Sequence, residues 1–201
     1  ANPIGVAATP NGNFVYVVNR NSTPASISVI NTSSHTVTAT ITSGIGSGPL
    51  GIAISPNGAL AYVGNSSSNT VSVINTSSNT VSTTITVGSG PTGIAFSTDG
   101  TRCYVANGSS LSNSVSVIDT INNVVAATIS VGTQPAGVSV TPNGAKVYVA
   151  NSGSNNVSVI ATSSNTVTAT ITVGTSPVAL GAFIQLAPYG VAPTVMITNW
   201  W

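Results

Sequence analysis

The stretch SPNGALAYVGNSSSNTVSVINTSSNTVSTTITVGSGPTGIAF, residues 55–96, carries the pattern that decides the fold. It contains no charged side chain, and runs rich in Val, Ile, Thr and Tyr alternate with turn formers. Pro-Asn-Gly and Ser-Ser-Asn steps suit tight turns because Asn and Gly tolerate positive φ. The runs Tyr-Val-x-Asn, Val-Ser-Val-Ile and Thr-Val-x-x-Thr-Ile alternate with the period of a strand. The stretch therefore predicts antiparallel β-structure.

The same pattern occurs four times along the chain. The repeated tyrosines are Tyr16, Tyr62, Tyr104 and Tyr148, at spacings of 46, 42 and 44 residues. A four-stranded repeat of ~40–45 residues is typical of a propeller blade, because stacked blades bury the sheet faces that one blade leaves open. We predict an all-β fold, a small β-propeller of four-stranded antiparallel blades in one domain over residues 1–201, with repeats near 3–48, 49–90, 91–134 and 135–176.

Several small or aromatic residues are expected in the tightly packed interior. Gly51, Gly93 and Gly137 are expected to begin the innermost strands, where backbones crowd near the axis. The repeated tyrosines are expected in the core or between blades. Cys103 is expected to be a buried apolar side chain, with a reactive or intermolecular thiol as the alternative.

The tail predicts a partial fifth repeat over residues 177–201. Pro177 aligns with Pro135, and TVMITN aligns with KVYVAN. Three outcomes are open: a two-stranded blade in a small closed ring, a piece of a longer propeller, or a half-blade that pairs its edge with another subunit. An open strand edge is a template for strand addition. Candidate assembly contacts are Met196, Trp200 and Trp201, while packing of both tryptophans on their own ring is the alternative.

The composition removes several classes of function. Charged residues make up 2 % of the chain, against roughly 25 % in an ordinary domain. Three scattered cations cannot form the basic stripe that nucleic acids require. No run of 18 apolar residues predicts a membrane span. A surface with so little charge repels its own copies weakly, which favours a protein that assembles or carries sugars.

No constellation of residues predicts catalysis, a metal or a cofactor. Asp99 and Asp119 occupy positions held elsewhere mostly by Asn, so both are expected to form turns. His35 is expected to be exposed in a turn. General acid–base catalysis usually needs paired carboxylates or a pocketed His, and metals need clustered ligands. We therefore expect no enzyme activity and no cofactor.

The repeats resemble the YVTN family of β-propellers. The segments AYVGN, CYVAN and VYVAN, each followed by VSVI and by TITVG or TISVG, carry the resemblance over about residues 3–174. The third motif position departs from Thr, with Val18, Gly64, Ala106 and Ala150 in its place. The resemblance implies a propeller fold. Such repeats occur in archaeal and bacterial surface-layer proteins, and related folds occur in lactonases and periplasmic redox enzymes.

Glycosylation is a further expectation at the acceptor motif N-x-[ST]. Asn31 and Asn75 open the NTSS turns and are expected to be exposed, whereas Asn65 and Asn107 end strands, where a turn-fixing hydrogen bond is the alternative. The candidate sites are Asn21, Asn31, Asn65, Asn75, Asn107 and Asn156. Attached sugars would hydrate a surface that lacks charge.

The sequence favours a non-enzymatic secreted or cell-surface structural protein that assembles with itself, as a filament or surface-layer subunit, through its open half-blade. The start ANPIG, without Met, fits either removal of a signal peptide or an arbitrary boundary. The alternative is an extracellular module that binds glycans or another ligand through loops such as NSSSNT (65–70). A lactonase-like enzyme ranks third.

Overall fold

The computed structural model describes residues 2–178 and 198–199, in which every regular element is a strand. The first sheet comprises β1 (Pro3–Ala8), β2 (Phe14–Asn19), β3 (Ser26–Asn31) and β4 (Thr36–Ile41). The second comprises β5 (Pro49–Ile54), β6 (Leu60–Asn65), β7 (Thr70–Asn75) and β8 (Thr80–Thr86). The third comprises β9 (Pro91–Phe96), β10 (Arg102–Asn107), β11 (Ser114–Asp119) and β12 (Val124–Ser130). The fourth comprises β13 (Pro135–Val140), β14 (Lys146–Asn151), β15 (Asn156–Ala161) and β16 (Thr166–Thr172).

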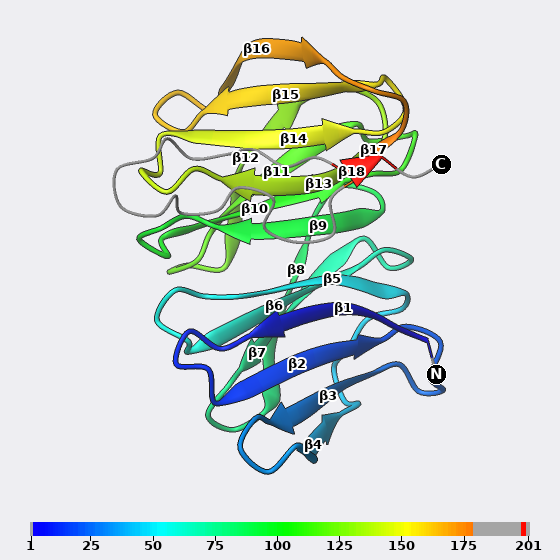
Figure 1. Ribbon diagram of the computed structural model, residues 1–201, viewed down its shortest axis with the longest axis vertical. Coiled ribbons are helices and arrows are strands. Elements are labelled where there is room, and N and C mark those ends of the chain that lie inside the picture. The colour runs from blue at the N-terminus through cyan, green and yellow to red at the C-terminus, as the bar shows by residue number, and fades with distance from the viewer. Residues whose placement is uncertain (1, 179–197, 200–201) are drawn as a thin grey trace.

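Each sheet is an antiparallel meander in which the strands pair in chain order. The four sheets follow one another along the long axis of the molecule, also in chain order (Figure 1). Neighbouring sheets contact mainly through their first strands, β1 with β5, β5 with β9 and β9 with β13. This arrangement confirms the predicted blades of a β-propeller.

The turn chemistry follows the sequence closely. The glycine of each Pro-Asn-Gly or Thr-Asp-Gly turn has a positive φ, at Gly12, Gly58, Gly100 and Gly144. The last residue of the Thr-Ser-Ser-x turn also lies in the left-handed region, at Asn79, Asn165 and the exposed His35. Asp99 and Asp119 both accept backbone N–H groups two residues ahead, so the prediction that they form turns is confirmed.

The hydrophobic core lies between the blades. Tyr16, Val18 and Val29 of the first blade pack against Ala61 and Val63 of the second. Two equivalent clusters join the second blade to the third and the third to the fourth. Tyr16, Tyr62 and Tyr104 are buried between blades and Tyr148 is half-buried, while Cys103 is a fully buried free thiol. Each blade therefore depends on its neighbour for its apolar contacts.

Glycine permits the close approach of the inner strands. A Cβ added to Gly51 would overlap the carbonyl oxygen of Thr92 in the next blade, and one on Gly5 would overlap that of Leu50. The inner strands begin two residues earlier than predicted, at Pro49, Pro91 and Pro135, and the glycines occupy their third positions. The expected role of the glycines in backbone crowding nevertheless holds.

The tail pairs as the first half of a fifth repeat should. β17 (Pro177–Val178) and β18 (Thr198–Asn199) form a two-stranded antiparallel sheet in which Pro177 lies opposite Asn199. The same register joins Pro135 to Asn151 in the fourth blade. β17 also contacts β13 and β14. Four blades plus a partial fifth are therefore confirmed, while Met196, Trp200 and Trp201 lie outside the described residues.

Candidate functional site

One face of the first blade lacks the cover that its counterparts have. It is formed by five apolar side chains of β1–β4, which we call the open face: Val6, Val15, Val17, Ile30 and Val37. Val6 is 64 % exposed and Val37 is 56 % exposed. Large exposed apolar side chains gathered on one face indicate a site of contact with another surface.

The equivalent residues of the later blades show what such a face normally does. Val17 corresponds to Val63, Val105 and Val149, all of which have 0 % exposure. Those three valines lie in the clusters that receive the preceding blade. The open face therefore has the side chains of a blade interface, and no blade within residues 2–178 packs on it.

The last complete blade has an exposed apolar residue on its opposite face. Ile171 of β16 is 45 % exposed, whereas its counterparts Ile41, Ile85 and Ile129 are 4 to 6 % exposed. The counterparts lie on the face that packs against the following blade. The first and fourth blades thus present apolar side chains on opposite faces, each a face that in the other junctions packs against a complete blade.

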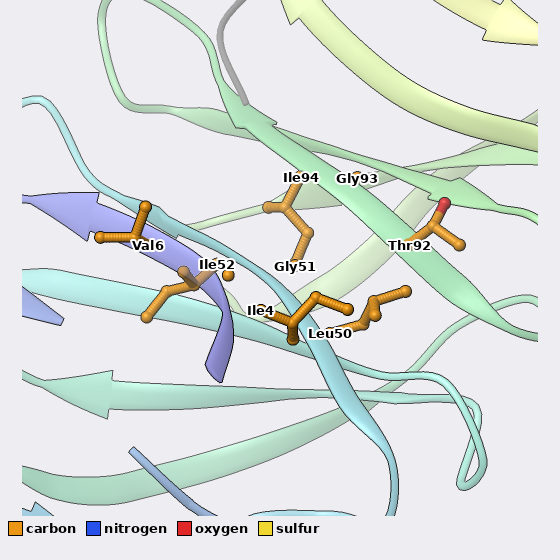
Figure 2. A pocket seen from close by; sticks show the side chains of 9 residues that line it. Ile4, Val6, Leu50, Gly51, Ile52, Thr92, Gly93 and Ile94 are labelled. Carbon is orange, nitrogen blue, oxygen red and sulfur yellow. The ribbon is translucent and has the colours of Figure 1, made fainter. Parts of the chain in front are cut away.

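The inner strands leave little space for a substrate between them. Figure 2 shows Ile4, Val6, Leu50, Ile52 and Ile94 around the junction of β1, β5 and β9. The cavity there is only about 20 Å³, which is room for roughly one water molecule. A larger hollow of about 540 Å³ lies at one end of the inner strands, and none of its lining side chains is titratable. Neither space offers a general acid or base.

Charged groups gather instead at the rim of the third blade, where it meets the fourth. Arg102 and Asp119 lie opposite each other on β10 and β11, and Asp99 lies in the turn before β10. The Oδ1 atom of Asp99 accepts hydrogen bonds from the Ser97 hydroxyl at 2.6 Å and the Thr101 amide at 3.0 Å. These bonds hold the pKa of Asp99 below its ordinary value. The carboxylate is therefore ionised at neutral pH.

The junction between the third and fourth blades differs from the first junction in its hydrogen bonds. At the first junction, the Tyr16 hydroxyl reaches the Asn79 side chain and the Thr76 carbonyl. At the third junction, the Arg102 guanidinium takes the equivalent acceptors, with Nη1 2.9 Å from the Thr162 carbonyl and 3.5 Å from Asn165 Oδ1.

As a result, the buried hydroxyl of Tyr104 has no hydrogen-bond partner. Burial raises the pKa of this phenol, and the neighbouring Arg102 side chain opposes part of that rise through its charge and a hydrogen-bonding contact. Sequence reasoning missed the arrangement, because Arg102 acts on residues about sixty positions away. Buried polar groups are rarely left unpaired, so this one points to a function or a bound molecule.

The candidate glycosylation sites divide into two groups. Asn65 and Asn107 are fully buried, and their amide nitrogens donate to hydroxyl groups of the next strand. The amide nitrogen is the atom that carries an N-linked sugar, so the folded blade has no room for one at either residue. Asn21 is exposed. Asn31 and Asn75 are half-buried rather than exposed as expected, because their Oδ1 atoms turn inward to accept amides of their own turns, and Asn156 is half-buried as well. Glycosylation at these four residues stays a prediction.

The described residues contain no group of three or more His, Cys, Asp or Glu side chains that could hold a metal. A helix long and apolar enough to cross a membrane is likewise not found in residues 2–178 or 198–199.

The stacked four-stranded sheets define the class of this protein, a β-propeller. The profile of the YNCE-like beta-propeller family matches residues 46–188, which is more than half of the chain. The chain therefore belongs to the YNCE-like β-propeller family. A second profile, described as lactonase, 7-bladed beta-propeller, matches residues 3–84. The expected β-propeller family is thus confirmed, while the finer YVTN surface-layer type stays a prediction.

Solved structures support the same class. A chain of Kuenenia stuttgartiensis hydrazine synthase superimposes with a TM-score of 0.80 at 27 % sequence identity. The match covers 88 % of this chain and 50 % of that chain, so this chain spans about half the length of its structural relative. No curated protein matches the sequence.

Proposed function

We propose that this chain is a non-enzymatic structural protein of the cell exterior that associates with copies of itself through its blade faces. The observation that carries the proposal is the open face. The counterparts of its Val15, Val17 and Ile30 in the next three blades all have 0 % exposure, because a neighbouring blade covers them. A second copy can supply the missing contact with the opposite end of its own blade series, where Ile171 is exposed.

The geometry of this contact favours extended assemblies. The two surfaces are opposite faces of different blades, the first and the fourth, so the contact is head-to-tail rather than self-complementary. Head-to-tail contacts generate rings when the rotation closes and open filaments when it does not. A filament or a surface layer, as expected from the sequence, would be built from such head-to-tail contacts.

The low charge of the chain supports the same function. The formal net charge is +1, and only 2 % of residues are charged. Weak electrostatic repulsion between copies lets short-range apolar contacts dominate association. A location outside the cell, with glycans on the exposed Asn21 and on the half-buried candidate asparagines, would supply the hydration that charges provide elsewhere.

Negative-stain electron microscopy of the purified chain tests the proposal. We expect filaments or rings that disperse when lysine replaces Val6 or Val37, because a charge at the open face must be desolvated on contact. Leu111→Lys is the matched control, since Leu111 is 89 % exposed outside the open face and should not affect assembly. Dispersed native particles, or equal assembly in all variants, would overturn the proposal.

A separate variant tests the half-blade contribution. Deletion of Trp200 and Trp201 should release subunits if the partial fifth repeat takes part in the contact. Unchanged assemblies after this deletion would show that the two tryptophans do not take part in the contact. The proposal would then rest on the open face.

Two other functions each have one supporting observation. A ligand-binding module is favoured by the unpaired Tyr104 hydroxyl at the third junction. A lactonase is suggested by the profile match over residues 3–84, but the larger hollow beside the inner strands has no titratable lining group. Hydrolysis of any lactone in a substrate panel by the native chain would show that the protein is an enzyme and would overturn the non-enzymatic proposal.

A further inference from the structure

The junction between the third and fourth blades forms a polar hollow that is open to solvent and lies outside the surfaces proposed for self-association. The pocket has a volume of about 320 Å³, within the range of small-molecule sites. Asp99, Arg102 and Tyr104 line it from the third blade, and Asn143, Thr162 and Ser163 line it from the fourth. It brings together two of the few charged residues in the chain.

We propose that this pocket binds a neutral sugar residue. A sugar hydroxyl donates and accepts hydrogen bonds at once, so it can donate to the Asp99 carboxylate while accepting from the Arg102 guanidinium. One positive and one negative group together give no net charge that would select an ion. Hydroxyl groups of Thr98, Thr101 and Ser163 extend the polar lining.

The unpaired phenol provides an independent indication of a ligand. Tyr104 has 0 % exposure and lines the pocket, yet its hydroxyl makes no hydrogen bond of good geometry, and the polar side chain that acts on it is Arg102. The Arg102 side chain that lies beside it is exposed, so a change of rotamer can open the path to this hydroxyl. A ligand hydroxyl that reached Tyr104 would remove the cost of the unpaired group.

The other side of the Asp99 turn suggests that the ligand is longer than one sugar. A second pocket of about 520 Å³ shares Asp99 and Thr101 with the first and lies between the second and third blades. Pro56, Leu60 and Phe96 give it an apolar wall. Sugar rings present C–H faces that pack on such surfaces, so neighbouring residues of an oligosaccharide can occupy the two pockets.

Titration of the 15N-labelled chain with maltotriose, cellotriose and chitotriose tests the site, together with a neutral glycan array. We expect amide shifts confined to residues 97–104, 143–144 and 162–163, with smaller shifts beside the second pocket. Asp99→Asn should weaken binding about tenfold, because a charged acceptor becomes a neutral one. This variant keeps the turn, since Asn occupies the same position at Asn11, Asn57 and Asn143.

The control variant and the outcomes that would overturn the proposal concern the same turn position and the same pocket. Asn11→Asp places a carboxylate in the corresponding turn of the first blade and should leave sugar affinity unchanged. Absence of binding to every sugar and array glycan overturns the proposal, as do shifts outside the third and fourth blades. Binding of acetate or inorganic phosphate in place of sugars also overturns it and identifies an anion site at Arg102. Because the site lies away from the open face, these results are independent of self-association.

Discussion

The hydroxyl of Tyr16 donates a hydrogen bond of 2.7 Å to Asn79 Oδ1, across the junction of the first two blades and 63 residues along the chain. Tyr62 makes the same bond to Asn123 at the second junction, at 2.8 Å. Tyr104 does not repeat it at the third junction, where Arg102 holds the acceptors. The first and second junctions therefore each have an equivalent Tyr–Asn hydrogen bond between blades. At the third junction, hydrogen bonds from Arg102 take its place.

Removal of the tyrosine hydroxyl should have different effects at different junctions. Tyr62→Phe loses a made hydrogen bond and should lower the free energy of unfolding by about 1 kcal/mol. Tyr104→Phe loses only an unpaired group and should leave that free energy unchanged or raise it. Urea unfolding followed by fluorescence measures both variants. Equal destabilisation would show that Tyr104 has a partner after all.

Arg102 should control whether Tyr104 takes part in a bond between blades. In an Arg102→Leu background, which copies Leu60 of the second blade, Asn165 and Thr162 become available to the tyrosine hydroxyl. Tyr104→Phe should then cost about 1 kcal/mol, although it costs nothing in the native chain. A double-mutant cycle in urea measures this coupling. Strict additivity of the two substitutions would contradict the proposed exchange of partners.

The inner-strand glycines should be far more sensitive than the turn glycines. Gly51→Ala forces a Cβ against the Thr92 carbonyl of the next blade, so it should cost about 3 kcal/mol through backbone displacement. Gly12→Ala meets no atom within 4 Å and should cost about 1 kcal/mol through its positive φ alone. Thermal and urea unfolding compare the two. A milder effect at Gly51 would show that the inner strands are less closely packed.

Acid should weaken the third blade through Asp99. Hydrogen bonds from Ser97 and Thr101 lower the folded-state pKa below the ordinary value of 3.8. The unfolded chain therefore binds the proton more tightly, so this stabilisation is present above pH 3.8 and is lost as the pH falls through the folded-state pKa. Asp99→Asn should flatten this part of the pH profile of unfolding. An identical profile for both proteins would exclude the carboxylate as its source.

Sequence reasoning predicted the features that recur within each repeat. The turn residues, the four strands and the register of Pro177 with Asn199 all follow from matching one repeat to the next. Features that depend on which blade is adjacent could not be predicted in this way. Val17 and Val63 have the same local pattern, yet only Val63 has an opposing blade. Likewise, the acceptors of Arg102 become its neighbours only after the blades stack.

Sedimentation velocity of the purified chain over a wide range of concentration is the sharpest test of self-association through the open face. The native chain should sediment faster as its concentration rises, because one copy covers the open face of the next. Val37→Lys should remain monomeric over the same range, and Leu111→Lys should behave like the native chain. A native chain that stays monomeric at every concentration would show that the open face does not mediate self-association.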